Sequence, residues 1–338
     1  MDRREIIRNV LAGESSNRLP RAIFGGGLWS FRQTGLKIEE VGQDPEHFGR
    51  SLAGLFRGLD TDIIFAGSGL NTFPAEAIGG RLAFREQQAP LLAFPVIEKT
   101  EDARYLDSIS ISDSPHAMAL VAMISSLRRH LPDRYICATS WGPFTWAMIL
   151  CDWNLLQEKT VSDRTFIREV CDLGVRLSFA FLEPLIKQGL IDGISIPDGA
   201  ATLVSDDLYR DIILPSERML FEKVRELGAG CFLHQCGNIL RQVSMYPDTG
   251  ADCVSLDAGV DIGEVYSLYS RQLVTAGNVD VINAIFGGDP DRICSAVAEC
   301  VSGIPRPFRR YILMPSCDLP PDTPLLNVKE FLACADRV

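Results

Sequence analysis

Gly230-Cys231-Phe232-Leu233-His234-Gln235 is a short apolar run that turns polar at its carboxyl end. A run of this length is typical of a strand buried in a parallel sheet. The stretch before it, Pro215–Leu227, has the periodicity of a helix. A buried strand that follows a helix in this way predicts a βαβ unit.

Seven further runs have the same character, and helical patterns such as 165–187 and 290–301 lie between them. Eight strands separated by helices favour closure into a single (β/α)₈ TIM barrel over an open sheet. The other seven expected strands are Ala22–Trp29, Asp62–Ala66, Tyr135–Ser140, Asp192–Pro197, Asp252–Leu256, Gln272–Gly277 and Arg310–Pro315.

A doubly wound open sheet would also alternate strands with helices, and its dinucleotide-binding form carries GxGxxG after an early strand. The early cluster Gly25-Gly26-Gly27 lacks that spacing and is followed by Trp29. We interpret the cluster as a tight turn or a close approach of two backbones.

Two segments fall outside the simple alternation. Residues 1–20 predict a helix that precedes the barrel, with a small apolar face around Ile6 and Leu11. Residues 79–96 predict a β-hairpin or lid inserted after the second strand. Because the chain has no 20–50-residue repeat and no long linker, we expect one domain spanning 1–338.

Composition narrows the class of protein. Hydrophobic residues make up 46% of the chain, and 33 basic residues face 44 acidic ones, for a net charge of -11. An acidic surface repels nucleic acid. The ten cysteines form no CxxC pair and several lie in apolar runs, so a reduced, cytoplasmic setting fits better than a disulfide-bonded, secreted one. No apolar stretch reaches about 18 residues, so we expect neither a signal peptide nor a membrane span.

Metal-binding residue types stand at two expected strand ends. His234 and Cys236 are two residues apart, so they point to the same face of an extended strand, and Cys317 follows the eighth strand at the same level of the barrel. Active sites of TIM barrels lie at this end. One imidazole and two thiolates suit Zn²⁺, and three ligands leave a fourth position open for chemistry. Taken alone, the His-x-Cys pair could equally be a buried histidine beside a structural cysteine.

Several segments carry a family resemblance that covers the chain from about residue 20 to the end. The chain resembles the uroporphyrinogen decarboxylase superfamily, and within it the cobamide-dependent methyltransferases, whose fold is a TIM barrel. The segments are Phe31-Arg32-Gln33-Thr34-Gly35, Trp141-Gly142-Pro143-Phe144-Thr145, Pro197-Asp198-Gly199-Ala200-Ala201, His234-Gln235-Cys236-Gly237-Asn238, Gly277-Asn278-Val279-Asp280 and Cys317-Asp318-Leu319-Pro320-Pro321-Asp322-Thr323-Pro324.

Departures from the decarboxylase pattern favour the methyltransferase branch. Decarboxylases carry RQAGRY near the amino terminus, and here Leu36 replaces the second arginine. The decarboxylase aspartate at the end of the second strand is missing, because that position holds Gly67-Ser68. Cys317 stands where the decarboxylases have a histidine near the carboxyl terminus.

The resemblance implies a zinc methyltransferase that moves a methyl group between a corrinoid and an acceptor, a thiol such as coenzyme M. The chain has no DxHxxG motif, so we expect the methylcobalamin or other corrinoid to be brought by a separate corrinoid protein. Two alternatives stay open. The enzyme could take methyl from a methylated donor, such as an aryl methyl ether, to cob(I)alamin, or the chain could be a tetrapyrrole-binding protein without catalysis.

Supporting roles are expected for four residues at or near strand ends. Asp198 could orient a ligand or accept a proton near the substrate, or it could simply cap the following helix. Arg32 could bind the anionic tail of a thiol substrate. Asn278 and Asp257 could line the pocket.

Overall fold

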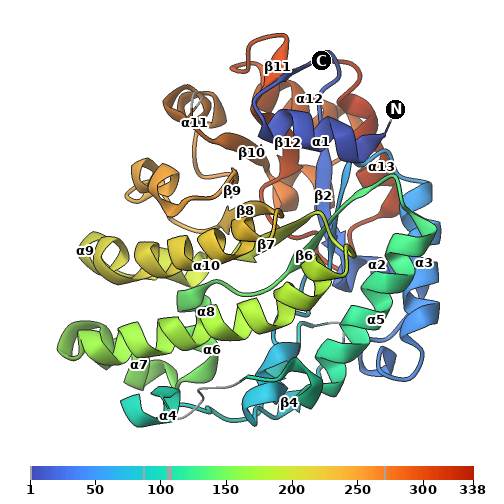
Figure 1. Ribbon diagram of the computed structural model, residues 1–338. Helices are drawn as coiled ribbons and strands as arrows, with labels where there is room; N and C mark the ends of the chain where they lie inside the picture. The colour runs from blue at the N-terminus through green and yellow to red at the C-terminus, as the bar shows by residue number, and fades with distance from the viewer. Residues whose placement is uncertain (1, 87, 105–108, 270–271) are drawn as a thin grey trace.

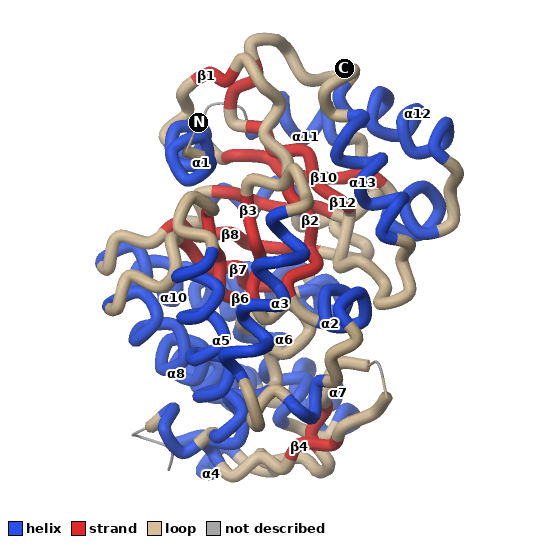
Figure 2. The backbone as a smooth tube through the Cα atoms, turned by 90° about the vertical axis from the view of Figure 1, so that its right-hand side faces the viewer, coloured by secondary structure: helices blue, strands red, loops and turns tan. Residues whose placement is uncertain are grey.

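Eight parallel strands form the centre of the molecule in a computed structural model that describes residues 2–86, 88–104, 109–269 and 272–338. Their order in the sheet is β2-β3-β6-β7-β8-β9-β10-β12, so strands that follow each other in the chain are neighbours. Figure 2 shows these strands gathered in the interior with helices around them. The strands are β2 (Ala22–Gly26), β3 (Ile63–Ala66), β6 (Tyr135–Thr139), β7 (Gly193–Pro197), β8 (Gly230–Gln235), β9 (Cys253–Leu256), β10 (Val274–Val279) and β12 (Tyr311–Pro315).

The first and last strands of this sheet meet and close it into a barrel. Arg21 forms a parallel bridge with Leu313, whose N–H donates to the carbonyl of Pro20 at 2.8 Å. Further along, the N–H of Leu319 donates to the carbonyl of Phe24 at 3.0 Å. Each of the eight expected runs overlaps one barrel strand, so the predicted TIM-type barrel is confirmed.

Helices follow the strands and surround the barrel (Figure 1). Expected helices 165–187, 215–227 and 290–301 agree with the observed bounds to within one residue. The helices of seven or more residues outside the amino-terminal segment are α2 (Leu28–Thr34), α3 (Pro45–Arg57), α5 (Pro115–His130), α6 (Pro143–Leu150), α7 (Trp153–Ser162), α8 (Arg164–Lys187), α10 (Leu214–Glu226), α11 (Ile262–Tyr269), α12 (Pro290–Val301) and α13 (Leu325–Cys334).

The first strand is shorter than expected, because it ends at Gly26 and Trp29 already belongs to α2. A Cβ atom on Gly26 would collide with the carbonyl of Phe65, and one on Gly27 would collide with the carbonyl of Ser68. The glycines therefore allow β2 to approach the end of β3 before the chain turns into a helix, as the interpretation of this cluster predicted.

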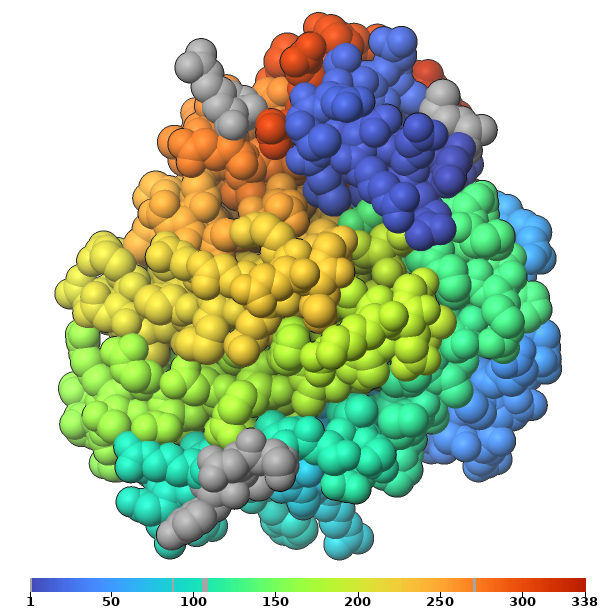
Figure 3. Space-filling view, viewed as in Figure 1, coloured from blue at the N-terminus to red at the C-terminus, as the bar shows by residue number. Residues whose placement is uncertain are grey.

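The amino-terminal segment covers the end of the barrel opposite the strand carboxyl ends. Helix α1 (Arg3–Leu11) packs Ile7 and Val10 into an apolar cluster with Tyr135 and Phe232 from inside the barrel. Arg4 forms an ion pair with buried Asp192 at 2.6 Å. Figure 3 shows this segment, in dark blue, lying between the carboxyl-terminal segments and the middle of the chain.

Within 79–96, β4 (Leu82–Ala83) pairs antiparallel with β5 (Leu91–Leu92). A second small antiparallel pair joins β1 (Ser15–Ser16) to β11 (Phe308–Arg309). Across the part of the chain that the structure describes, no helix has the length and apolar character needed to cross a membrane.

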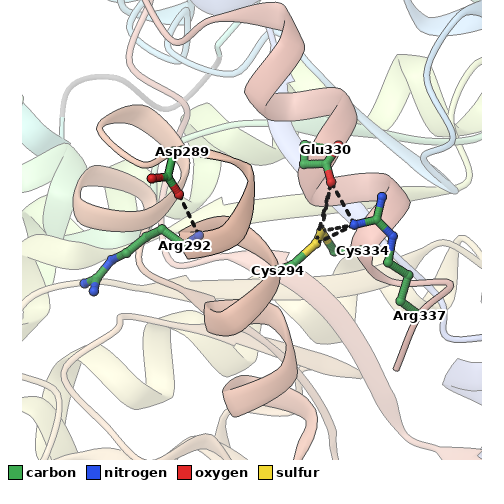
Figure 4. Close-up of a disulfide and its surroundings, with 6 residues drawn as sticks. All are labelled: Asp289, Arg292, Cys294, Glu330, Cys334 and Arg337. Atoms are coloured by element: carbon green, nitrogen blue, oxygen red, sulfur yellow. Dashed lines mark hydrogen bonds and ion pairs between the residues drawn. A yellow bond between two sulfur atoms is a disulfide. The ribbon is translucent and has the colours of Figure 1, made fainter.

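The sequence led us to expect reduced cysteines, but Cys294 of α12 and Cys334 of α13 form a disulfide. The two residues are 40 positions apart, so only the packing of α12 against α13 brings them together. Figure 4 shows Glu330 and the Arg337 guanidinium beside the two sulfurs, and Arg337 Nη1 lies 3.0 Å from Cys294 Sγ. The eight remaining cysteines are free.

Reducing this disulfide should lower the free energy of unfolding by ~2–4 kcal/mol, because the cross-link restricts the unfolded chain over a loop of this length. Urea unfolding of the protein with and without dithiothreitol measures the change. The Cys294→Ala variant is the control, since reductant should leave its unfolding curve unchanged. Ten free thiols in the intact, non-reduced chain would contradict the pairing.

Candidate metal centre

Three metal-binding side chains converge at the carboxyl ends of β8 and β12. His234 is the penultimate residue of β8. Cys236 directly follows that strand, and Cys317 follows β12. Their ligand atoms lie within 4.8 Å of one another. Donor atoms around a tetrahedral zinc are about 3.3–3.8 Å apart for ordinary zinc–nitrogen and zinc–sulfur bonds. The fold therefore brings together the three donors predicted from the sequence. A small shift of these side chains toward one another would give the spacing found around zinc.

The orientation of the His234 ring leaves one nitrogen free for a metal. Nδ1 lies 3.1 Å from the hydroxyl of Ser255 on β9, and the ring packs against Phe24 with 4.8 Å between ring centroids. Nε2 is buried and has no hydrogen-bond partner among the described residues. A buried polar atom without a partner is costly, and an Nδ1–H bond to Ser255 would leave the Nε2 lone pair as the ligand. The site therefore fits a metal ion.

The thiols influence one another strongly. A hydrogen bond from the Cys317 thiol lowers the pKa of Cys236. The same hydrogen bond, together with burial, raises the pKa of Cys317. For His234, burial lowers the pKa, but contact with Cys317 and the nearby carboxylates more than offset it, and the pKa is raised. Zinc binds the deprotonated thiols, so a divalent ion at this position would displace the thiol protons.

Backbone geometry supports the loop that carries Cys236. Asp257 accepts hydrogen bonds from the N–H groups of Gly237 at 3.0 Å and Gly259 at 3.1 Å. It therefore braces the residue that follows the ligand, and its expected place in the pocket lining stays a prediction. A Cβ atom on Gly199 would lie 2.6 Å from Cys236 Sγ, so this position has room only for glycine.

The carboxylate at this end of the barrel comes from the loop after β12, whereas in the decarboxylase pattern it comes from the end of the second strand. Ser68, at the end of β3, donates a hydrogen bond to Asp318, which follows Cys317 in the chain. Asp318 stays accessible to solvent, yet the surrounding protein raises its pKa. Neither this pair nor the role of Ser255 was predicted. The position of Asp318 next to a ligand was the available signal for the pair.

Arg32 lies on α2 at the rim and not among the three donors. Its Nε donates to Asp322 at 2.9 Å, and both side chains are exposed. Together with Phe31, Phe84 and Pro321, Arg32 lines a cavity of about 390 Å³ between α2 and the β4–β5 hairpin.

Asn278 supports a loop beside the site. Its side-chain amide donates to the carbonyls of Asp257 at 2.8 Å and Val260 at 2.9 Å. Asn278 also lines a separate cavity of about 490 Å³ with Asp280 and Cys300. Its amide thus acts on the loop that contains Asp257, the brace of the Cys236 loop.

Asp198 directly follows β7, next to the strand that carries His234, and it is fully buried. Its carboxylate accepts hydrogen bonds from the amides of Phe144 at 3.2 Å and Thr145 at 2.6 Å, both in the first turn of α6. Burial raises its pKa to about 6. The helix it caps is therefore α6, the first helix after β6, whereas the sequence suggested the helix that follows Asp198.

Comparison with known proteins decides the family. The family model described as uroporphyrinogen decarboxylase (URO-D) matches residues 2–338. This chain belongs to the uroporphyrinogen decarboxylase family. The resemblance seen in the sequence motifs is confirmed over the whole chain.

Relatives within the URO-D family have more than one activity. The methylcobamide:CoM methyltransferase MtbA of Methanosarcina acetivorans is 24% identical over 268 residues, covering 78% of this chain and 76% of that protein. The uroporphyrinogen decarboxylase of Neisseria gonorrhoeae is 26% identical over 294 residues, covering 84% of this chain and 77% of the relative. A solved methyltransferase from Methanosarcina mazei superimposes with a TM-score of 0.87 at 20% identity, covering 100% of this chain and 99% of that structure. The last likeness supports the barrel fold.

We expect the purified URO-D family protein to bind about one zinc ion per chain, and Cys317→Ala to release most of it, since one of three protein ligands is lost. Elemental analysis after dialysis measures the zinc content. Cys171→Ala, which changes a buried free cysteine in α8, serves as the matched control and should keep its zinc. Full zinc retention by Cys317→Ala would exclude Cys317 from the site.

Proposed function

We propose that this protein is a zinc-dependent methyltransferase that moves a methyl group between a corrinoid on a partner protein and a thiol of the coenzyme M type. One observation carries the proposal: His234, Cys236 and Cys317 lie within 4.8 Å of one another with His234 Nε2 unpartnered. The names of the Methanosarcina relatives, which specify methylcobamide and coenzyme M, support this choice of substrates.

Zinc held by these residues would supply an open position at which a thiol loses its proton and remains nucleophilic. Two thiolate ligands reduce the effective charge of the ion, which keeps the bound sulfur reactive. The chain's own part is to hold the donors in place. Ser255 fixes the His234 ring, and Asp257 braces Gly237 beside Cys236.

Arg32 is the candidate for orienting an anionic substrate. It is exposed at the rim and borders a cavity lined both by apolar side chains, such as Phe31, and by charged ones, such as Lys37. A guanidinium can bind a sulfonate or carboxylate through two hydrogen bonds, in exchange for its present contact with Asp322. The zinc ligands do not distinguish the two directions of transfer, and a methylated donor would use the same open position.

The protein, methylcobalamin and a short thiol should together yield cob(I)alamin and a thioether. The change in corrinoid absorbance follows the reaction. Cys317→Ala should slow it by more than about 100-fold, since even changes outside the ligand set reach that size. The Cys171→Ala control should keep wild-type rates.

A second assay covers the opposite direction, with reduced cobalamin and a methyl ether in place of the thiol. If zinc-loaded protein is inactive in both directions with a cognate corrinoid protein supplied, the methyltransferase proposal is wrong.

Uroporphyrinogen should not be decarboxylated by this protein. The physical reason is that Ser68 and Leu36 occupy the positions where decarboxylases have an acid and an arginine. Incubation with uroporphyrinogen, followed by separation of the porphyrins after oxidation, tests the expectation. Formation of coproporphyrinogen would restore the decarboxylase alternative.

A further inference from the structure

A second acidic group, Glu217, is fully buried where α10 packs against β8, and it has no part in the chemistry described above. Its Oε2 accepts a hydrogen bond from the Tyr209 hydroxyl at 2.8 Å. Its Oε1 accepts one from the side-chain amide of Gln235 at 3.1 Å. Burying a carboxyl group is expensive unless each oxygen has a partner, and here both have one.

Gln235 is the residue between two candidate zinc ligands, His234 and Cys236. Its side chain is fully buried, and its amide oxygen has no hydrogen-bond partner among the described residues. The hydrogen bond from its Nε2 to Glu217 is therefore the contact that sets the orientation of the amide group. Any shift of Glu217 would be transmitted to the peptide that carries both ligands.

Glu217 also lies near Asp198, which follows the neighbouring strand β7. Its carboxyl group lies close enough to that of Asp198 for each group to shift the pKa of the other. The N–H of Asp198 donates to the carbonyl of His234 at 3.0 Å, which joins Asp198 to the strand that carries the ligands. The next residue, Gly199, packs against Cys236 Sγ. Burial, followed by the charge of the neighbouring Asp198, raises the pKa of Glu217 well above its usual range.

We propose that Glu217 is a positioning residue for the metal centre, acting through Gln235 to hold His234 and Cys236 at the spacing that zinc requires. The inference rests on the metal-binding part of the proposed function. Groups that orient metal ligands from outside the coordination sphere commonly change metal affinity by about 10–100-fold when they are removed.

Isosteric variants separate this role from packing. Glu217→Met removes both oxygens at nearly constant volume and should weaken zinc binding by about 10–100-fold. Glu217→Gln should bind zinc nearly as well as wild type, since its amide oxygen can still accept from Gln235 while its NH₂ group contacts Asp198 and Tyr209. Tyr209→Phe leaves the bond to Gln235 in place and should have a small effect.

The control variant is Asp62→Asn, which changes an equally buried carboxylate at the opposite end of the barrel. Asp62 pairs with Arg3 at 3.1 Å and accepts from the Arg21 N–H at 3.0 Å, so its change should lower stability without changing the metal centre. A loss of zinc affinity in Glu217→Met but not in Asp62→Asn, at comparable losses of stability, would therefore be specific.

Two readouts need no methyl transfer. Competition with a chromophoric chelator measures the zinc Kd, and the charge-transfer and ligand-field bands of the Co²⁺-loaded protein report the geometry of the two thiolates. Gln235→Met should reproduce the effect of Glu217→Met, and the Glu217→Met/Gln235→Met double variant should bind no worse than the weaker single variant, since both changes remove the same contact.

An unchanged zinc Kd and an unchanged Co²⁺ spectrum in Glu217→Met would overturn this inference. If that variant does not fold, an unchanged spectrum in Gln235→Met has the same meaning. Failure of the wild-type protein to bind either metal would instead contradict the proposed function, so the two failures are distinguishable.

Discussion

Closure of the barrel between β2 and β12 is the constraint on which the site depends. The bridge from Arg21 to Leu313 and the bond from the Leu319 N–H to Phe24 join the two ends of the sheet. Because all eight strands are parallel, closure places every strand carboxyl end on one rim. Cys317 then faces His234 and Cys236, although it lies about 80 positions later in the chain. An open sheet would hold the two cysteines apart.

The metal centre is supported from the neighbouring strand and from the layer between the strands and the helices. Ser255 on the next strand contacts the His234 ring, and Asp257 holds the turn after Cys236. Between the strands and the helices lie the buried carboxyl groups of Asp198 and Glu217, linked to the amides of α6 and to Gln235. Such buried polar groups cost free energy unless their partners are in place, so each one restricts the positions its neighbours can adopt. The result is a rigid site below a rim that carries more exposed groups, such as Arg32.

Membership of the URO-D family explains the scaffold but leaves the chemistry to individual side chains. Its relatives include one named as a decarboxylase and others named as methyltransferases. In this chain the end of β3 has Ser68 in place of an acid, and the carboxylate it contacts is Asp318 from the loop after β12. A change of this kind alters the charge at the mouth without altering the fold, which is why function has to be argued from the site.

The sequence alone determined the eight strands and the three candidate ligands, because buried parallel strands are continuous apolar runs and strand ends collect the reactive residues. It also identified Asp198, Arg32 and Asn278, but their neighbours are known only from the tertiary structure. Packing decided that Asp198 caps α6, that Asn278 supports the Asp257 loop, and that Cys294 joins Cys334. Each of these contacts links residues more than 20 positions apart, and local patterns of hydrophobicity and spacing carry no information on which distant side chains meet. The Glu217–Gln235 contact has the same origin, since a glutamate in an amphipathic helix looks solvent-exposed until the helix is packed on the barrel.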